Sequence, residues 1–265
     1  MNARLKDSFE SNSHPLGTWV SVGHPTVAEI SASVGMDFIL VDLEHTAMTL
    51  ETVESLVRAV EAAEGDTEIL VRVPWNDHVR IKRILDIDVD GIMVPMLESA
   101  AETEELVAAT RYPPEGRRGI ASGRAAEYGQ SFEEYVASAN SDIVTIGQIE
   151  TQEGVENAEG IAAVDGLDAL FVGPADLSAA YGVFAQWDSE TLTEAMGAII
   201  DAADRADTPI GTLTVDPDDM EMRLEQGFDY LIAGKDTSYL SAANRETKAR
   251  YERLIEQREE NIETN

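Results

Sequence analysis

The sequence contains no cysteine, which excludes disulfides, thiolate metal sites and thiol nucleophiles. It also lacks any apolar run near the roughly 18 residues that a membrane-spanning helix needs. Residues 1–17 have no apolar segment of the kind found in secretory signals. We therefore expect a cytoplasmic protein without a membrane partner.

Basic residues are scarce as well. Lys plus Arg is 19 against 51 for Asp plus Glu, and the formal net charge is −32. Such a chain repels nucleic acid and anionic membranes. The acidic residues are scattered along helical stretches such as 98–110, as in a salt-adapted, haloarchaeal protein with a hydrated carboxylate surface. An ordinary acidic cytosolic protein is the alternative.

Eight short apolar runs alternate with amphipathic stretches along the 265 residues. The runs are β-branched and continuous, which is typical of strands buried on both faces. Eight strands, each followed by a helix, predict an α/β protein with a (β/α)₈ barrel as a single domain over residues 1–265. A doubly wound sheet is less favoured, because no G-x-G-x-x-G turn is present. The expected strands are 17–22, 38–44, 68–74, 91–97, 143–150, 169–177, 209–213 and 230–236.

Two segments stand apart from this alternation. Residues 111–141 form the only long predicted connection, and a loop of that length is usually functional. A last helix is predicted over 241–261, and we expect the charged segment from about residue 255 to be frayed.

Polar residues gather where the predicted strands end. Catalytic side chains of a barrel lie at the carboxyl ends of its strands. Polar side chains from four strands are therefore expected to converge on one rim. They are Asp42, Glu44 and His45 at the end of the second strand, Arg72 at the end of the third, Gln148 and Glu150 at the end of the fifth, and Asp176 at the end of the sixth.

Glu150 and Asp176 form the candidate metal site. Two carboxylates that share a space need a cation between them, or one of them takes up a proton. An oxygen-only ligand set favours a hard divalent ion such as Mg²⁺, Mn²⁺ or Co²⁺, with positions left open for water and a chelating oxo acid. Alternatively, the two residues cap the helices that follow them.

His45 and Arg72 are the candidate catalytic residues. An imidazole titrates near neutral pH, and Asp42 or Glu44 would orient it. Alternatively, His45 only hydrogen-bonds to backbone. Arg72 interrupts an apolar strand and would stabilise a developing enolate oxygen. Alternatively, it forms a structural ion pair with Asp42 or Glu44.

The segment "VGPADL" contributes a turn that opens a helix. There, the Gly173-Pro174-Ala175 turn could bind a substrate carboxylate through backbone N–H groups, or simply join strand to helix. Lys235, at the end of the last strand, would permit a Schiff-base mechanism instead. Its acidic neighbour Asp236 argues against the apolar pocket that such a lysine needs.

Several of these segments together resemble the HpcH/HpaI class II aldolases, whose members cleave 2-keto-3-deoxy sugar acids and related 4-hydroxy-2-oxo acids. The resemblance covers about residues 16–250. The runs "RYPPEGRRG" and "QIETQEGVEN…FVGPADL" are its most specific parts, and "VDLEHTA" and "VRVP" extend it.

This resemblance implies the binding roles of the rim. Glu150 and Asp176 would bind the divalent metal, and Gln148 would lie close to the metal and the substrate. The turn Gly173-Pro174-Ala175 would hold the carboxylate of pyruvate. The small-molecule partners would be an oxo acid and an aldehyde.

The resemblance also implies a mechanism and an assembly. Arg72 would stabilise the pyruvate enolate, and His45, supported by Asp42, would assist proton transfer through a water on the metal. The barrel would exchange its last helix between subunits of a homo-oligomer, commonly a hexamer.

The chain departs from the family pattern near the predicted aldehyde site. The segment "IGTLT" holds Thr212, Leu213 and Thr214 in the region that would bind the aldehyde. "GKD" places Lys235 where a small residue is usual, so Lys235 could bind an anionic substrate end. In the long loop, Arg118 and Arg124 could do the same, or form loop ion pairs.

We therefore predict a metal-dependent pyruvate aldolase, a carbon–carbon lyase. A citrate-lyase-β-like or malyl-CoA-type lyase is the alternative, although few basic residues are available for the phosphates of CoA. A non-catalytic oxo-acid-binding barrel is the third hypothesis.

Overall fold

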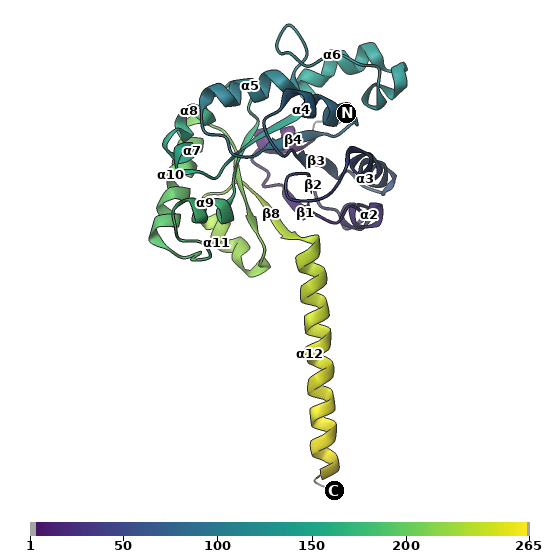
Figure 1. The fold of residues 1–265 in the computed structure, drawn as a ribbon, viewed down its shortest axis with the longest axis vertical. Helices are drawn as coiled ribbons and strands as arrows, with labels where there is room; N and C mark the ends of the chain where they lie inside the picture. Colours follow the sequence, from purple (N-terminus) through teal and green to yellow (C-terminus); the bar gives the residue numbers. More distant parts are fainter. Residues whose placement is uncertain (1–3, 264–265) are drawn as a thin grey trace.

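The computed structural model describes residues 4–263, and its centre is a closed barrel of eight parallel strands (Figure 1). Each strand pairs with the next one along the chain, and β8 pairs with β1 to close the barrel. The predicted (β/α)₈ fold is therefore confirmed. The strands are β1 (Leu16–Val20), β2 (Phe38–Asp42), β3 (Glu68–Arg72), β4 (Gly91–Val94), β5 (Val144–Ile149), β6 (Ala169–Val172), β7 (Ile210–Thr214) and β8 (Tyr230–Lys235).

Alternation along each strand divides the core into two layers. In β2, Phe38 and Leu40 belong to the cluster inside the barrel. Ile39 and Val41 pack between the barrel and its helices. This explains the continuous apolar runs, because both faces of each strand are buried. The next inward position after Leu40 is Asp42, so the same alternation delivers a carboxylate to the barrel mouth.

Helices surround the barrel, and most of them follow the strands as the sequence predicts (Figure 1). They bury one apolar side against the strands and expose charged residues on the other. The helices are α1 (Arg4–Glu10), α2 (Pro25–Ser33), α3 (Leu50–Ala62), α4 (His78–Leu85), α5 (Ala100–Thr110), α6 (Phe132–Asp142), α7 (Gln152–Glu156), α8 (Ala158–Ala162), α9 (Pro174–Ala180), α10 (Glu190–Ala206), α11 (Met220–Glu225) and α12 (Asp236–Glu263), with 3₁₀ turns η1 (Arg124–Gly129) and η2 (Pro217–Asp219).

The predicted long connection at 111–141 is partly helical, so that prediction was wrong for its second half. Helix α6 occupies Phe132–Asp142 and buries Tyr135 and Ala139, which lie four residues apart on one face. Glu133 and Glu134 are in its first turn, where carboxylates favour a helix. The irregular part of the connection is therefore limited to the segment before α6.

Helix α12 leaves the barrel and projects away from it (Figure 1). It continues to Glu263, beyond residue 255, where we expected fraying. Lys248 and Glu252 form an i,i+4 ion pair in it, with Nζ and Oε1 3.4 Å apart. A sequence rich in Glu, Arg and Lys favours a helix even where it is solvated.

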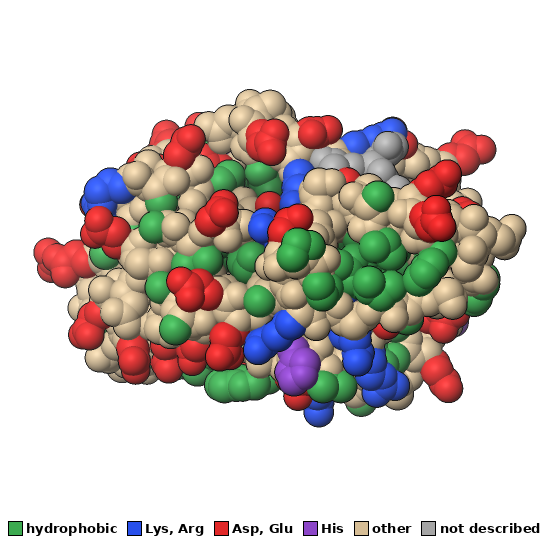
Figure 2. All heavy atoms as spheres, turned by 90° about the horizontal axis from the view of Figure 1, so that it is seen from above, with side chains coloured by type: hydrophobic (Ala, Val, Ile, Leu, Met, Phe, Trp, Pro, Cys, Tyr) green, Lys and Arg blue, Asp and Glu red, His purple; other side chains and the backbone are tan. Residues whose placement is uncertain are grey.

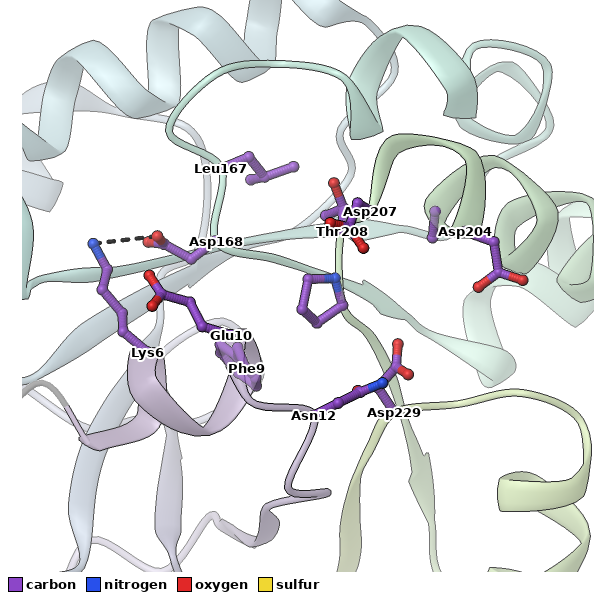
Figure 3. A pocket seen from close by; sticks show the side chains of 12 residues that line it. Lys6, Phe9, Glu10, Asn12, Leu167, Asp168, Asp204, Asp207, Thr208 and Asp229 are labelled. Carbon is purple, nitrogen blue, oxygen red and sulfur yellow. Dashed lines mark ion pairs between the residues drawn. The ribbon is translucent and has the colours of Figure 1, made fainter.

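The amino-terminal end of the barrel, here called the floor, is closed by α1. Leu5 and Phe9 of α1 join the interior cluster. Lys6 pairs with Asp168, with Nζ and Oδ1 3.2 Å apart, beside a cavity of about 440 Å³ (Figure 3). The sequence did not predict α1.

An aspartate precedes each even-numbered strand at the floor. Its carboxylate accepts a hydrogen bond from a backbone N–H near the start of the preceding odd-numbered strand. These bonds, 2.7–2.9 Å long, satisfy backbone donors that the parallel ladder leaves unpaired. The four pairs are Asp37 with Leu16, Asp90 with Ile69, Asp168 with Thr145, and Asp229 with Ile210.

Acidic side chains are scattered over the face shown in Figure 2, as the sequence predicted, and are not gathered in one patch. Among residues 4–263, none of the helices combines the length and apolar character that crossing a membrane requires.

Candidate active site

Arg72 and Asp42 lie side by side at the carboxyl end of the barrel, here called the rim. Their Cα atoms are partners in the β2–β3 register. Nε and Nη2 of Arg72 donate to the two oxygens of Asp42 at 3.1 and 3.0 Å. Nη1 of Arg72 lies 2.9 Å from Oε2 of Glu44. Both ion pairs offered as the alternative role of Arg72 therefore exist, and they hold its guanidinium at the barrel mouth.

Trp19 supports this ion pair and was not among the predicted site residues. The guanidinium carbon of Arg72 lies 4.5 Å from the centre of the Trp19 ring, a cation–π contact. Trp19 Nε1 is also 3.4 Å from Oδ2 of Asp42. Its inward place in the run "GTWVSV" was the available signal, because inward positions near strand ends face the barrel mouth.

Asp42 accepts hydrogen bonds from Arg72 and from backbone N–H groups, and not from the ring of His45. Oδ1 of Asp42 accepts from the N–H groups of Glu44 and His45 at 3.0 and 3.3 Å. Burial alone would raise the pKa of Asp42, but the hydrogen bonds and charge of Arg72 outweigh it and lower the pKa. The His45 side chain is exposed, and Nε2 is 3.8 Å from Oε2 of Glu44. The structure thus places Glu44, not Asp42, beside the imidazole.

Glu150 is buried at the end of β5 and has specific partners. Oε1 accepts from the Met96 N–H at 3.1 Å, and Gln148 Nε2 donates to Oε2. Helix α7 is capped by Thr151, whose side chain accepts from the Gly154 N–H. The interpretation of Glu150 as a helix cap is therefore wrong.

Asp176 lies in the first turn of α9, on the neighbouring β6–α9 connection. No side-chain cap hydrogen bond is formed at the start of this helix. The charge of Asp176 acts on both Glu150 and Glu44, so the three carboxylates share one region of the rim. No hydrogen bond supports the alternative that Asp176 caps α9.

The electrostatics of this region suit a cation. The pKa of Glu150 is raised to about 7, mainly by burial and then by the charges of Asp176 and Glu44. Burial also raises the pKa of Glu44, against the opposing charge of Arg72. The side-chain oxygen of Gln148 is buried without a hydrogen-bond partner among the described residues.

The ligand set is small. Within residues 4–263, no group of three or more His, Cys, Asp or Glu side chains is arranged to hold a metal ion by itself. Glu150 and Asp176 fit a divalent ion as an oxygen-only pair, which leaves coordination positions for substrate and water. Metal binding by this pair stays a prediction.

Gly173 keeps space beside Glu150. A Cβ atom at this position would lie 2.5 Å from Glu150 Oε2 and 2.6 Å from Gln148 Nε2. Only glycine therefore lets the turn Gly173-Pro174-Ala175 approach the two side chains. Binding of a carboxylate by this turn stays a prediction.

The side chain of Thr212 is turned toward the neighbouring strand, and its predicted substrate role stays a prediction. It is fully buried, and its hydroxyl donates to the Val172 carbonyl at 3.0 Å. Leu213 is the inward residue of this strand and packs against the interior cluster. The hydroxyl of Thr214 donates to the Asp216 carbonyl at 2.8 Å.

Lys235 ends β8 and makes no hydrogen bond or ion pair within the described range 4–263. Its neighbour Asp236 accepts from the N–H groups of Ser21 and Val22 at 2.8 and 2.7 Å. The aspartate of "GKD" therefore anchors the loop after β1. A role for Lys235 in binding or catalysis stays a prediction.

The two loop arginines form ion pairs, which was the alternative to substrate binding. Arg118 is fully buried beside the Tyr112 ring, at 4.6 Å, and its Nη2 is 3.2 Å from Asp86 Oδ1. Arg124 pairs with Asp88 at 3.3 Å and with Glu61. These contacts fix the 111–129 segment to the helices beside it.

The match to known proteins covers most of the chain. A family profile described as HpcH/HpaI aldolase/citrate lyase matches residues 16–243. The chain belongs to this family. It is 41% identical over 222 residues to a 4-hydroxy-2-oxovalerate aldolase of Novosphingobium aromaticivorans, a match that covers 84% of each chain.

Two further relatives support the same family assignment. A hydroxypyruvate/pyruvate aldolase of Paraburkholderia phytofirmans is 36% identical over 247 residues, covering 91% of this chain and 95% of that one. A family protein from Burkholderia cenocepacia J2315, known from its crystal structure, is 32% identical and superposes with a TM-score of 0.91. The match covers 95% of this chain and 100% of that one. The predicted enzyme class, a carbon–carbon lyase of the aldolase type, is confirmed.

Proposed function

We propose that this HpcH/HpaI protein is a class II pyruvate aldolase that reversibly cleaves a 4-hydroxy-2-oxo acid, of the 2-keto-3-deoxy sugar acid type, to pyruvate and an aldehyde. The observation that carries the proposal is the convergence of Arg72 with Glu44, Glu150 and Asp176 at the rim of an aldolase-family barrel. A buried cationic group beside a repelling set of carboxylates suits a reaction that develops an enolate.

Glu150 and Asp176 would hold the divalent ion, which can be Mg²⁺, Mn²⁺ or Co²⁺. When bound, the ion supplies Lewis-acid polarisation of the 2-oxo group of the substrate. Support for this assignment comes from the raised pKa of Glu150 and from the buried, unpartnered oxygen of Gln148.

Side chains of the protein would stabilise the charge and transfer the protons during cleavage. Cleavage removes the proton of the C4 hydroxyl, breaks the C3–C4 bond and leaves its electron pair as the enolate of pyruvate. Arg72, fixed by Asp42 and Trp19, would stabilise that developing negative charge. His45, exposed at the rim beside Glu44, would exchange protons with the substrate. Protonation of the enolate at C3 then gives pyruvate.

The test is pyruvate release from a 2-keto-3-deoxy sugar acid in high salt. We expect activity to be lost with EDTA, restored by Mg²⁺ or Mn²⁺, and retained in enzyme that was treated with pyruvate and borohydride and then freed of both before the assay. Glu150→Gln should abolish the activity, and Glu153→Gln, an exposed carboxylate on α7, is the matched control. Activity that survives EDTA but is lost with borohydride plus pyruvate would instead point to Lys235 and a Schiff base.

The CoA-dependent lyase has weaker support. The curated relatives described above carry aldolase names, and the acidic surface offers few groups for CoA phosphates. Tight, competitive inhibition by CoA would revive this alternative.

Subunit exchange of α12 is part of the same proposal. The helix leaves its own barrel and exposes Leu240, Tyr251 and Leu254. Ile30 of helix α2 and its C-cap residue Val34 are also exposed. Apolar side chains on a projecting helix favour burial against a second copy, in a homo-oligomer such as a hexamer. Leu240→Glu combined with Leu254→Glu should reduce the molar mass measured by light scattering in high salt.

The net charge of −32 supports adaptation to high salt, as in a haloarchaeal protein. Salt screens repulsion among exposed carboxylates, so stability should rise with KCl concentration. Full activity and stability in dilute buffer would contradict this adaptation.

A further inference from the structure

The inside of the barrel holds an unusual share of the aromatic residues. Aromatic side chains are 6% of the sequence, yet Phe9, Trp19, Phe38, Phe171 and Tyr230 all belong to the small buried cluster inside the barrel. The larger cluster between the barrel and its helices is almost entirely aliphatic. Branched aliphatic side chains are also the usual filling of a barrel interior. The rings inside this barrel therefore suggest a role beyond filling space.

Four of these rings form a column from the floor to the rim. Phe9 of α1 lies at the floor, and its ring centre is 5.0 Å from that of Tyr230, the first residue of β8. Tyr230 lies 6.3 Å from Phe171 of β6, and Phe171 lies 6.1 Å from Trp19, near the end of β1. Aromatic pairs attract one another at such separations. The column ends on the cation of the rim, because the guanidinium carbon of Arg72 is 4.5 Å from the Trp19 ring.

The column is closely held along its length. Each of its four rings belongs to a residue that is at most 6% exposed. The hydroxyl of Tyr230 donates to the Leu170 carbonyl at 2.8 Å, which anchors this ring to β6. A Cβ at Gly211 would lie 2.4 Å from the Tyr230 ring, so glycine in β7 leaves the room that the ring occupies. Because a close-packed interior transmits strain, we expect a displacement at the floor to reach Trp19.

We propose that α1 positions Arg72 through this column and that the three lower rings are positioning residues that act through Trp19. Two carboxylates hold the guanidinium from its edges, and the Trp19 ring holds its face. The place of the Trp19 ring depends in turn on the rings packed below it. This inference rests on the proposed aldolase function, which assigns Arg72 to the developing enolate.

The alternative is that Phe9 only closes the floor, and Leu5 provides the matched control. Leu5 lies on the same helix, belongs to the same interior cluster and is 2% exposed, but it adds no ring to the column. Phe9→Ala and Leu5→Ala should both lower the melting temperature, because each leaves a cavity at the floor. The two variants differ in whether the column loses its lowest ring.

The test measures the exchange of pyruvate methyl protons with D₂O, in high salt with Mn²⁺ and well below the melting temperature of each variant. Phe9→Ala should lower kcat by about tenfold, because a small displacement of a stabilising group slows a reaction strongly. KM for pyruvate should stay within about twofold, since Arg72 acts on the developing enolate. Leu5→Ala should keep kcat within about twofold of wild type. Equal losses of kcat in the two variants would overturn the column.

A double-mutant cycle tests the route through Trp19. In a Trp19→Leu background, where Arg72 has lost its ring, Phe9→Ala should change kcat by less than about twofold. A tenfold loss in that background, as in wild type, would show that Phe9 acts by another route. Tyr230→Leu should lower kcat as Phe9→Ala does, and Tyr230→Phe, which keeps the ring, should recover most of it.

Tryptophan fluorescence gives a readout that does not depend on activity. Trp75 and Trp187 are exposed, so Trp75→Phe with Trp187→Phe leaves Trp19 as the only tryptophan. In this protein Phe9→Ala should shift the emission of Trp19, because the packing of its ring on Arg72 changes, and Leu5→Ala should not. If Phe9→Ala does not fold, Phe9→Leu keeps an apolar side chain at the floor without a ring and should change kcat and emission in the same direction.

The outcomes separate this inference from the proposed function. If the wild type exchanges pyruvate protons and a folded Phe9→Ala or Phe9→Leu protein does so with the same kcat, the role of the column alone is overturned. Absence of exchange in the wild type, together with no pyruvate release from a 2-keto-3-deoxy sugar acid, would overturn the aldolase function itself. The emission of Trp19 would still report whether the column reaches Arg72.

Discussion

The two ends of the barrel both bury carboxylates at strand ends, but they give them different partners. At the floor, Asp90 and Asp168 accept hydrogen bonds from backbone N–H groups of a neighbouring strand. At the rim, Glu150 faces the charges of Asp176 and Glu44, with Arg72 as the nearby cation. The floor uses its aspartates to complete the sheet, whereas the rim gathers its carboxylates around an arginine and an open space.

A perturbed pKa therefore does not by itself identify the active end. Burial raises the pKa of Glu68 at the floor to about 7, the same value that Glu150 reaches at the rim. The floor aspartates have backbone partners, and Asp168 also pairs with Lys6 (Figure 3). The rim has an unpartnered amide oxygen, a glycine that keeps space open and an arginine. Functional assignment depends on these unfilled contacts.

The largest effect is expected from Arg72 at the rim. Arg72→Met should lower kcat for pyruvate release by about 10³-fold, because the developing enolate loses its fixed cation. It should also destabilise the fold by about 3–5 kcal/mol, since Asp42 and Glu44 lose their buried partner. Arg72→Lys should recover part of both losses. Near-wild-type kcat in a folded Arg72→Met protein would contradict the assigned role.

Gly173→Ala should have the next largest effect. Its Cβ would meet Glu150 and Gln148, so both side chains must shift, and we expect a fall in kcat of about 10–100-fold. Gly197→Ala in α10 is the control, because a Cβ there meets nothing within 4 Å. The control should keep full activity and gain about 0.5–1 kcal/mol. Equal kcat in the two variants would show that the space beside Glu150 is not needed.

At the floor, Asp90→Ala should lower the stability of the fold and leave the activity nearly unchanged. The Ile69 N–H loses its acceptor, which should cost about 1–3 kcal/mol in the free energy of unfolding. Activity of the folded protein should stay within about twofold, because the residue lies at the opposite end of the barrel. Asp201→Ala, an exposed residue of α10, is the matched control for denaturant unfolding. A large loss of kcat in folded Asp90→Ala would remove the distinction between the two ends.

The smallest predicted effect concerns pH. Burial and the charge of Asp90 raise the pKa of folded Glu68 from 4.5 to about 7, so folding takes up a proton over this range. The contribution of Glu68 is full below pH 4.5 and is lost as the pH rises through 7. Between pH 5.5 and 7.5 the wild type should therefore lose about 1–2 kcal/mol more than Glu68→Gln does. Parallel pH profiles for the two proteins would contradict this.

Much of the barrel and its rim could be predicted from local sequence. Continuous apolar runs located all eight strands, because strands buried on both faces leave that pattern. Strand ends then located Arg72, Glu150 and Asp176, since parallel strands in a barrel deliver their carboxyl ends to one rim.

Other features depend on pairings that no local pattern encodes. Asp42 was expected to orient His45, but the β2–β3 register places it opposite Arg72. Thr212 was expected at the substrate, but its side chain bonds to the neighbouring strand. The closure of the floor by α1 is set by packing between segments that are distant in the sequence. The floor aspartates did leave a signal, an Asp before every second strand.

The most direct test of the difference between the two ends is exchange of pyruvate methyl protons with D₂O, followed by NMR in high salt. It reports enolate formation without any aldehyde. We predict that the wild type, Asp90→Ala and Glu153→Gln catalyse exchange that EDTA stops and Mn²⁺ restores, whereas Glu150→Gln does not. Exchange that persists in Glu150→Gln, or that EDTA leaves unchanged, would contradict a metal-assisted site at the rim.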